Sequence, residues 1–500
     1  MSIVIINACF YPLATTVILL SILGYGRVIN NFFYKDLFNY QFRNLILFQG
    51  LIFTGLFSII INIFFPLKDI YSISVIIIGL FLYLINFSKI NLKDEINFIS
   101  IVVIFSSFLA IYAGVNDDFD YHLKIINNYK NYNLFEIIPG RQVSYNSFWL
   151  FLHSVFSINK YIASLFILGS LIFAITIYDL FFILKKSFKE NEFIISAISF
   201  LILIFLLGVQ NKLKDFGTDL PGAIISFYIL LIIVNEFFYK KQLSINILIF
   251  LILLSSFVFV IKLTNVLILF FVILYIVKVN LLSINLKNIY LPFLLIFFWF
   301  FQNLIISGCL IWPIETTCFY NIEDPANEFA IIESFAKGDM IGAMKTDNFE
   351  WIGIWFSAHS KKIFETYALF FLISISPLII NFFIKDKYFK NNNILEIYLY
   401  KFRYYELLAV IIISNLVWFF NAPAYRFGLF YNSLLIIFVS IPFWLKIFSK
   451  NKEFIYKYFR FLIILIFIYF AYENIFKIKW YFDRYEIWPP IINGELVNRI

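Results

Sequence analysis

The stretch LILFQGLIFTGLFSIIINIFF, residues Leu45–Phe65, decides the class of this protein, because it contains no charged side chain and is long enough to cross a bilayer. A helix rises about 1.5 Å per residue, so about 20 apolar residues match the roughly 30 Å of hydrocarbon in a membrane. A soluble protein can bury one such run as a core helix. Runs of this kind, such as Ile289–Ile306, recur along the 500 residues, of which 62% are hydrophobic and only 14% charged. We therefore expect a polytopic membrane protein.

The sequence contains about fourteen apolar runs of spanning length, several of them near the lower limit of about 17 residues. They lie at 3–23, 45–65, 70–87, 97–114, 161–184, 193–209, 219–238, 245–261, 263–279, 289–306, 365–384, 405–421, 427–447 and 459–476. We expect an all-α fold, a polytopic transmembrane helix bundle of about 12–14 spans that forms one integral membrane domain over residues 1–500. The pairs 245–261/263–279 and 405–421/427–447 are so closely joined that each could instead be a broken or re-entrant pair.

Lysines and arginines gather in alternate loops, beside the apolar runs. This pattern is typical of topology determinants, so the net charge of +8 does not indicate a nucleic-acid partner. If the N-terminus lies outside, the inner loops carry most of the basic residues. We therefore expect a multi-pass protein of the inner (plasma) membrane. Two long loops, 115–160 and 307–364, and all three histidines then lie on the extracytoplasmic, or periplasmic, side.

The first long outer loop, residues 115–160, carries three aspartates and a histidine within NDDFDYHL, Asn116–Leu123. Asn116 or Asp117 can cap a helix there, and acidic residues in its first turn suit the helix dipole. Helix capping would explain one of these acidic residues but not all three. After a break at IIPGRQVSYNS, the Phe-, Trp- and Leu-rich stretch Phe148–Phe156 predicts a second helix. Both helices are expected to lie in the membrane interface.

The second long outer loop, residues 307–364, opens with SGCLIWPIETTCFYN and later contains NFEWIGIWFSAHSKK, which suggests another interfacial helix. Cys309 and Cys318 lie on the side where disulfides can form. A bridge between them is left open, with free thiols as the favoured reading. The sequence has no CxxC pair and no Cys/His cluster with zinc spacing. His153 and His359 are expected to be surface residues.

These features together resemble the GT-C class of membrane glycosyltransferases, which use a polyprenyl-phosphate-linked sugar as donor. More narrowly, the chain is similar to a bacterial family of large membrane proteins found with surface-polysaccharide genes. In that family an acid shortly before Tyr-His-Leu is followed by a Gly-Arg turn and an Asn-Ser-x-Trp piece. The matching residues here are Asp118, Tyr121, His122, Leu123, Gly140, Arg141, Asn146, Ser147 and Trp149. The likeness extends to GxLIWP at Gly308–Pro313 and APxxRFG at Ala422–Gly428, and so covers most of the chain between the first long loop and Gly428.

The resemblance implies an inverting glycosyltransferase that moves a sugar from a polyprenyl-phosphate donor to a surface glycan or lipid-linked acceptor outside the membrane. Such a reaction needs a base for the acceptor hydroxyl, and positive charge or a metal for the leaving phosphate. Asp117 or Asp118 fits the base, and Asp120 or His122 could orient it. Asp118 and Asp120 could also help to hold a divalent cation, Mg or Mn.

Basic side chains on the outer side are the candidates for binding the phosphate: Arg141, Lys212, Lys214, Lys262 and Arg426. Arginine suits bidentate phosphate contact, and Arg426 is the lone charge in an apolar, Pro-containing turn. Its alternative role is to snorkel to the interface. Tyr121 and Asp219 complete the predicted substrate-binding set. The segment FGTDLPG around Asp219 also reads as a turn and a helix N-terminus, with Pro221 at an early helical position.

Two other functions fit the same composition. A polysaccharide polymerase or ligase would also use lipid-linked sugars outside, but it would rely on arginines rather than on an acid pair. A lipid-linked saccharide transporter or flippase would carry acids and bases in mid-span and would show an internal repeat. Most ionisable residues of this chain lie in loops, and no clear repeat is visible.

Overall fold

The computed structural model of the chain is helical, and its described part contains no β-strand. It describes residues 2–33, 43–86, 91–110, 118–138, 140, 143–158, 166–210, 217–240, 242–279, 289–320, 324–338, 349–383 and 394–448, with scattered positions between 457 and 475. The elements are α1 (Ser2–Phe33), α2 (Arg43–Phe64), α3 (Asp69–Ile85), α4 (Leu92–Ala110), α5 (Asp118–Asn131), α6 (Phe148–Phe156), α7 (Ile167–Lys189), α8 (Phe193–Gly208), α9 (Asp219–Tyr239), α10 (Ile245–Ile261), the 3₁₀ helix η4 (Leu263–Ile268), α11 (Leu269–Lys278), α12 (Tyr290–Ser307), the 3₁₀ turn η7 (Glu315–Thr317), α13 (Pro325–Ala336), α14 (Trp351–Phe383), α15 (Ile394–Asn421) and α16 (Leu429–Phe448).

Seven helices of the described residues are long and apolar enough to cross a membrane: Cys9–Phe33, Arg43–Phe64, Ile167–Lys189, Asp219–Tyr239, Tyr290–Ser307, Arg403–Asn421 and Leu429–Lys446. Shorter apolar helical segments lie at Asp69–Ile85, Phe193–Gly208, Ile245–Ile261 and Leu263–Lys278. By length and composition these helices identify a membrane protein, and the expected all-α helix bundle is confirmed at this level. The number of 12–14 spans stays a prediction.

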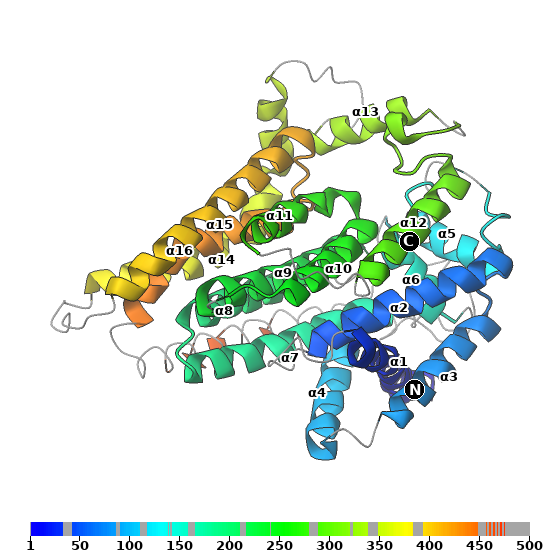
Figure 1. Cartoon of the computed structure of the whole chain (residues 1–500), viewed down its shortest axis with the longest axis horizontal. Coiled ribbons are helices and arrows are strands. Elements are labelled where there is room, and N and C mark those ends of the chain that lie inside the picture. The colour runs from blue at the N-terminus through cyan, green and yellow to red at the C-terminus, as the bar shows by residue number, and fades with distance from the viewer. Residues whose placement is uncertain are drawn as a thin grey trace.

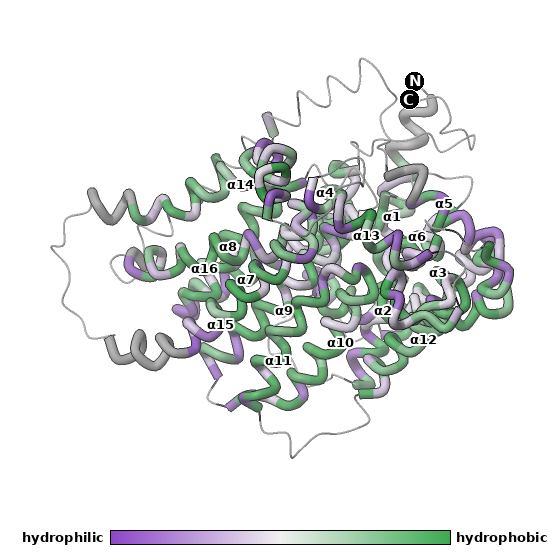
Figure 2. The backbone as a smooth tube through the Cα atoms, turned by 90° about the horizontal axis from the view of Figure 1, so that it is seen from above, coloured by the Kyte–Doolittle hydropathy of each residue, from purple (hydrophilic) through white to green (hydrophobic). Residues whose placement is uncertain are grey.

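The long helices pack side by side in a bundle (Figure 1). In that view α8, α9 and α10 lie in the middle, between α14, α15 and α16 on one side and α1, α2 and α7 on the other. The central helix α9 is almost wholly buried, whereas only a minority of the residues Arg403–Asn421 of α15 are buried. Figure 2 shows that hydrophobic residues line most of α7, α8, α9 and α10, while hydrophilic residues gather toward helix ends and loops. Large hydrophobic side chains are also exposed on other helices, such as Phe81 of α3 and Phe293 of α12, as expected for a bundle surrounded by lipid.

The two ends of the bundle collect different polar groups. At one end, named here the Arg27 end, Glu95 of α4 binds Arg27 of α1 at 2.5 Å and Arg43 of α2 at 3.3 Å. Lys278 of α11 also pairs with Glu406 of α15 at 2.7 Å at this end. The opposite end, named the Lys262 end, is where α10 and α12 finish and where the first long loop packs on them. The cations at the Arg27 end are those that the charge pattern assigns to the inner side.

The two helices predicted in the first long loop are present as α5 and α6, and α6 has the expected bounds. Every residue of α6 is buried inside the protein, however. Phe148 packs against the backbone of Gly55 in α2, and its ring lies 5.9 Å from that of Phe257 in α10. The interfacial reading of Phe148–Phe156 is therefore wrong, and so is the surface reading of His153, which is 1% exposed. An apolar helix has the same composition whether lipid or protein covers it, which explains the error.

The second long loop differs from expectation in its helices. The predicted separate interfacial helix in NFEWIGIWFSAHSKK is instead the first part of α14, which continues unbroken to Phe383. Its 33 residues extend about 50 Å, which is longer than the roughly 30 Å of hydrocarbon in a membrane. The unpredicted helix α13 begins at Pro325, where the Asp324 carboxylate accepts the Asn327 N–H at 3.1 Å. Its buried Glu328 accepts the hydroxyl of Tyr145, which joins the two long loops.

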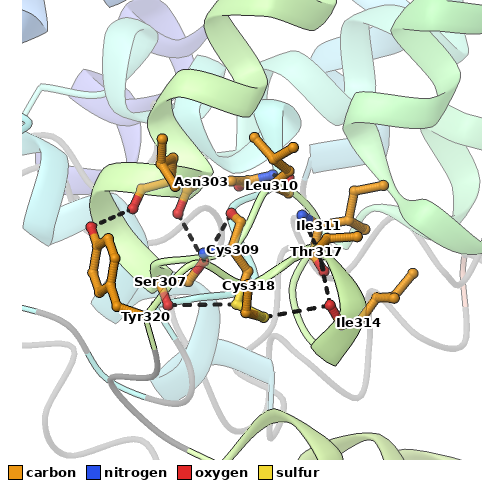
Figure 3. The surroundings of a disulfide bond; sticks show 10 residues. Asn303, Ser307, Cys309, Leu310, Ile311, Ile314, Thr317, Cys318 and Tyr320 are labelled. Carbon is orange, nitrogen blue, oxygen red and sulfur yellow. Dashed lines mark hydrogen bonds between the residues drawn. A yellow bond between two sulfur atoms is a disulfide. The ribbon is translucent and has the colours of Figure 1, made fainter.

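Cys309 and Cys318 form a disulfide just after α12 (Figure 3), so the favoured reading of free thiols is wrong. A tight chain reversal brings the two residues together. The Leu310 N–H donates to the Thr317 carbonyl at 3.0 Å, and the Phe319 N–H donates to the Gly308 carbonyl at 2.9 Å. Gly308 makes the reversal possible, because its φ of 77° lies in the left-handed region that favours glycine.

Candidate functional site

Three of the predicted site residues, Asp219, Lys262 and Arg426, come together at the Lys262 end of the bundle. The Lys262 ammonium pairs with the Asp219 carboxylate and lies 4.1 Å from the centroid of the Phe427 ring. The guanidinium carbon of Arg426 lies 5.3 Å from the same ring. The two ion-paired side chains are 21% and 20% exposed, so the pair is only partly open to water. Asp219, Lys262, Arg426 and Phe427 are named the Lys262 cluster below.

Lys262 occupies the joint between α10 and η4. Its backbone is extended, with φ −159° and ψ 126°, so it ends one helix and η4 starts at the next residue. A 3₁₀ helix rises about 2 Å per residue, so η4 and α11 together return about 27 Å, close to the roughly 26 Å length of α10. The closely joined pair 245–261/263–279 is therefore a hairpin whose second arm is a broken helix, with Lys262 at its tip.

A close approach between α9 and η4 brings Asp219 to Lys262. Gly222 lies one turn after Asp219, and a Cβ built on Gly222 would lie only 2.3 Å from Asn265 Nδ2. Asn265 lies three residues after Lys262, so one crossing of the two segments produces both contacts. The segment FGTDLPG does form the helix N-terminus that was one of its two readings. It also supplies the carboxylate of the cluster.

Arg426 and Phe427 lie in the turn Ala422–Gly428 between α15 and α16, and two indoles hold this turn in place. Trp355 Nε1 of α14 donates to the Pro423 carbonyl at 2.6 Å, and Trp418 Nε1 of α15 donates to the Ala424 carbonyl at 3.3 Å. Arg426 itself is exposed, and no residue that the structure describes forms an ion pair with it. The turn thus presents a solvated guanidinium beside the Lys262 pair.

The Asn-Ser-x-Trp piece fastens the first long loop to the helix that carries Lys262. Ser147 Oγ donates to the carbonyl of Ile261 at 2.7 Å, directly before Lys262 in the chain. The same oxygen accepts the N–H of Trp149 at 3.2 Å and so caps α6. Ser147 therefore holds the backbone of α10 in place directly before Lys262.

Two further contacts attach Asn146 to its surroundings. Its Oδ1 accepts the hydroxyl of Tyr129 in α5 at 2.5 Å, and its carbonyl accepts Trp299 Nε1 of α12 at 2.8 Å. The piece therefore joins α5, α6, α10 and α12 at one point. A structural role accounts for its place in the motif.

Sequence reasoning missed Lys130, which is 1% exposed at the end of α5. Its ammonium donates to Asp69 at 3.2 Å, to Ser72 Oγ at 3.0 Å and to the Ser157 carbonyl, so its three donors all have acceptors. Burial lowers the pKa of Lys130 below the ordinary lysine value, while the Asp69 carboxylate acts in the opposite direction. Nothing in the sequence around Lys130 distinguishes it from a solvated lysine of an amphipathic helix. Trp355, whose indole holds the turn of Arg426, was likewise missed.

The predicted acidic centre lies at the start of α5, which begins at Asp118. Asp117, Arg141, Lys212 and Lys214, and the side chains of Asp118, Asp120 and Tyr121, lie outside the described residues. His122 is described, and it is 6% exposed. Asp118 lies about 16 Å along the α5 axis from Tyr129, whose hydroxyl contacts Asn146. The assignments of base and metal ligands to these acids therefore stay predictions, and among described residues no group of three or more His, Cys, Asp or Glu could hold a metal.

His359 of α14 lies beside the same turn as Arg426. Its ring centroid is 6.1 Å from that of Tyr425 and 5.8 Å from that of Trp355. The side chain is half-buried, so its expected surface position is only partly right. Burial, together with the nearby Lys362 ammonium, lowers the pKa of His359 below the ordinary histidine value. The imidazole is therefore neutral at pH 7.

Residues 10–433 match the family described as Domain of unknown function (DUF8201), which is most of the chain, so the protein belongs to this family. No curated protein matches the chain, and no solved structure matches it.

Proposed function

We propose that this protein is a GT-C-like membrane glycosyltransferase. It transfers a sugar from a polyprenyl-phosphate donor to a surface glycan or a lipid-linked acceptor at the outer face of the inner membrane. The Lys262 cluster is the observation that carries the proposal. A lipid-linked phosphate needs cations for its head group and apolar surface for its chain. The cluster offers Lys262 and Arg426 around the Phe427 ring, at the end of a bundle of apolar helices.

The proposed chemistry divides between the start of α5 and the Lys262 cluster. Asp117 or Asp118 at the start of α5, oriented by Asp120 or His122, takes the proton of the acceptor hydroxyl. The acceptor oxygen then bonds to the anomeric carbon with inversion, and the bond from that carbon to the phosphate oxygen breaks. Lys262 and Arg426 stabilise the negative charge that develops on the leaving phosphate. A divalent cation held by Asp118 and Asp120 would neutralise further phosphate charge when bound.

Two observations support an outward-facing Lys262 end. The Cys309–Cys318 disulfide follows α12, which finishes at this end, and disulfides persist in oxidising compartments. The basic residues Arg27, Arg43 and Lys278 lie at the opposite end, as the excess of basic residues on the cytoplasmic side requires.

The test compares the surface glycan of cells that carry the wild-type protein, Asp118→Asn, Arg426→Gln or Lys278→Gln. Lys278→Gln is the matched control, because it removes a paired cation at the Arg27 end. We expect Asp118→Asn to abolish one glycan modification at an unchanged protein level, and Arg426→Gln to reduce it. Mass spectrometry of the glycan and immunoblotting of the protein measure the two quantities. A normal glycan in Asp118→Asn and Asp117→Asn would count heavily against the transferase.

A polysaccharide polymerase or ligase is the second candidate, and the exposed Arg426 favours it, because these enzymes would rely on arginines. Loss of glycan in Arg426→Gln and Arg141→Gln, together with indifference to changes at Asp117 and Asp118, would select this candidate.

A further inference from the structure

We propose that Asp219 is a resident counter-ion of Lys262 that the leaving lipid phosphate displaces. The inference rests on the proposed function, because it takes the ligand to be the phosphate of a polyprenyl lipid. It assigns Asp219 a role of its own: the carboxylate holds the place on Lys262 that the phosphate occupies when the sugar is transferred.

The geometry of the pair is the first argument. The Lys262 ammonium contacts the Asp219 carboxylate while the Phe427 ring covers it at 4.1 Å. About four fifths of each side chain is shielded from water. A cation shielded in this way loses much of its hydration, so it needs an anion beside it whether or not substrate is bound. An arriving phosphate therefore exchanges with Asp219 and does not simply add to the site.

The exchange favours the leaving phosphate over the intact donor. The phosphodiester of a sugar-linked donor carries one negative charge, as Asp219 does, whereas a phosphate monoester carries about 1.5 to 2 at pH 7. The larger charge of the monoester also strengthens its attraction to Arg426, which forms no ion pair with the described residues and lies 5.3 Å from the ring that Lys262 contacts. Both effects grow as the bond to the sugar breaks, so the exchange stabilises the transition state more than the bound donor.

The displaced carboxylate also has a favourable place to go. Asp219 is the first residue of α9, whose 21-residue helix dipole favours a negative charge at its N-terminus. Its side chain is 20% exposed, so the carboxylate is already partly solvated while it contacts Lys262. Release of Asp219 from Lys262 thus leaves no buried, uncompensated anion.

A plain structural ion pair is the competing reading, and the chain contains a matched pair to test against it. Lys278 and Glu406 lie 2.7 Å apart at the Arg27 end, with exposures of 26% and 21%, close to those of the Lys262 pair. If both ion pairs were only structural, removal of the acid from either pair should have the same effect on lipid-phosphate binding.

The experiment measures binding of undecaprenyl phosphate to the full-length protein in nanodiscs, by quenching of tryptophan fluorescence and by native mass spectrometry. Undecaprenol and inorganic phosphate are the companion probes, which separate the contributions of the lipid chain and the free anion. Loss of a partly exposed competing carboxylate should tighten binding about 3- to 10-fold in Asp219→Asn. Lys262→Gln should weaken binding by at least a similar factor, and Glu406→Gln should leave it unchanged. Undecaprenol binding should not respond to any of these changes.

Equal or weaker binding of undecaprenyl phosphate by a folded Asp219→Asn protein would overturn the inference. Asp219→Ser, which keeps a helix-capping side chain at the start of α9, replaces Asp219→Asn if the latter fails to fold. Failure of the proposed function is a separate result. Normal glycan in the Asp118→Asn cells with tighter lipid-phosphate binding by Asp219→Asn would keep the phosphate site and discard the transferase.

Discussion

Replacement of Gly222 by alanine tests the crossing of α9 and η4 that brings Asp219 to Lys262. The new Cβ would lie 2.3 Å from Asn265 Nδ2, and ordinary contact begins at 3.4 Å, so the amide must move by 3.4 − 2.3 = 1.1 Å. Asn265 is 8% exposed and has little room, and its amide lies 3.5 Å from the Val258 carbonyl that accepts its N–H. Overfilling a packed site costs about 1–3 kcal/mol, so we expect Gly222→Ala to lower the free energy of unfolding by about 1–2 kcal/mol.

Unfolding curves in mixed SDS micelles measure this loss for Gly222→Ala, Asn265→Ala and the double variant. Asn265→Ala removes the obstructing amide, so the double variant should recover about 1–2 kcal/mol relative to the sum of the single changes. Gly169→Ala on α7 is the control, because a Cβ there meets nothing within 4 Å, and it should be neutral or slightly stabilising. Strict additivity of the two single changes, or a Gly222→Ala protein as stable as Gly169→Ala, would refute the packing argument.

Three further outcomes are expected in the same unfolding assay. Ser147→Ala loses both the bond to the α10 carbonyl and the α6 cap, at a cost of about 1–2 kcal/mol, whereas Ser147→Thr keeps most of the stability. Lys130→Met should lower the free energy of unfolding by about 2 kcal/mol, which is less than for a fully buried ion pair because the partner Asp69 is partly solvated. Lys124→Met, on the exposed face of the same helix, should leave the stability unchanged. The pKa of His359 is lowered by folding, so the unfolded chain binds more protons and stability should rise with pH up to about 6.5. Because the His359 side chain is half-buried, this rise of stability with pH should be small, and His359→Gln should remove it. The same pH dependence of stability in His359→Gln and the wild type would contradict the lowered pKa of His359.

The parts of the fold that the sequence predicted are those set by local pattern. Long uncharged runs predicted helices such as α2, and α6 was predicted with its observed bounds, because hydrophobic length and turn residues are readable in one segment. Burial of α6 was not predicted. Whether lipid or another helix covers an apolar surface depends on packing partners elsewhere in the chain, here Gly55 and Phe257.

The candidate site was predicted as separate residues but not as a site. Lys262 and Arg426 stood out because each is a charge in an apolar setting, and Asp219 stood out only as an alternative to a helix cap. Their contact depends on the hairpin at Lys262 and on the turn pinned by Trp355, and neither is encoded within a short window. The Cys309–Cys318 bridge escaped prediction for the same reason, because cysteine spacing does not reveal the chain reversal that Gly308 permits.

The six 3₁₀ residues of η4 fix the azimuth of the helix that follows. A 3₁₀ helix turns about 120° per residue and an α-helix about 100°, so η4 rotates α11 by about 120° relative to a continuous α-helix. With this rotation α11 packs Phe271, Val272 and Tyr275 inside and leaves Val277 78% exposed. An insertion of one residue in Leu263–Ile268 would swing that inward face away from the bundle. The number of residues in η4 therefore decides which face of α11 packs into the bundle, and this number matters more than the identity of most of the η4 side chains.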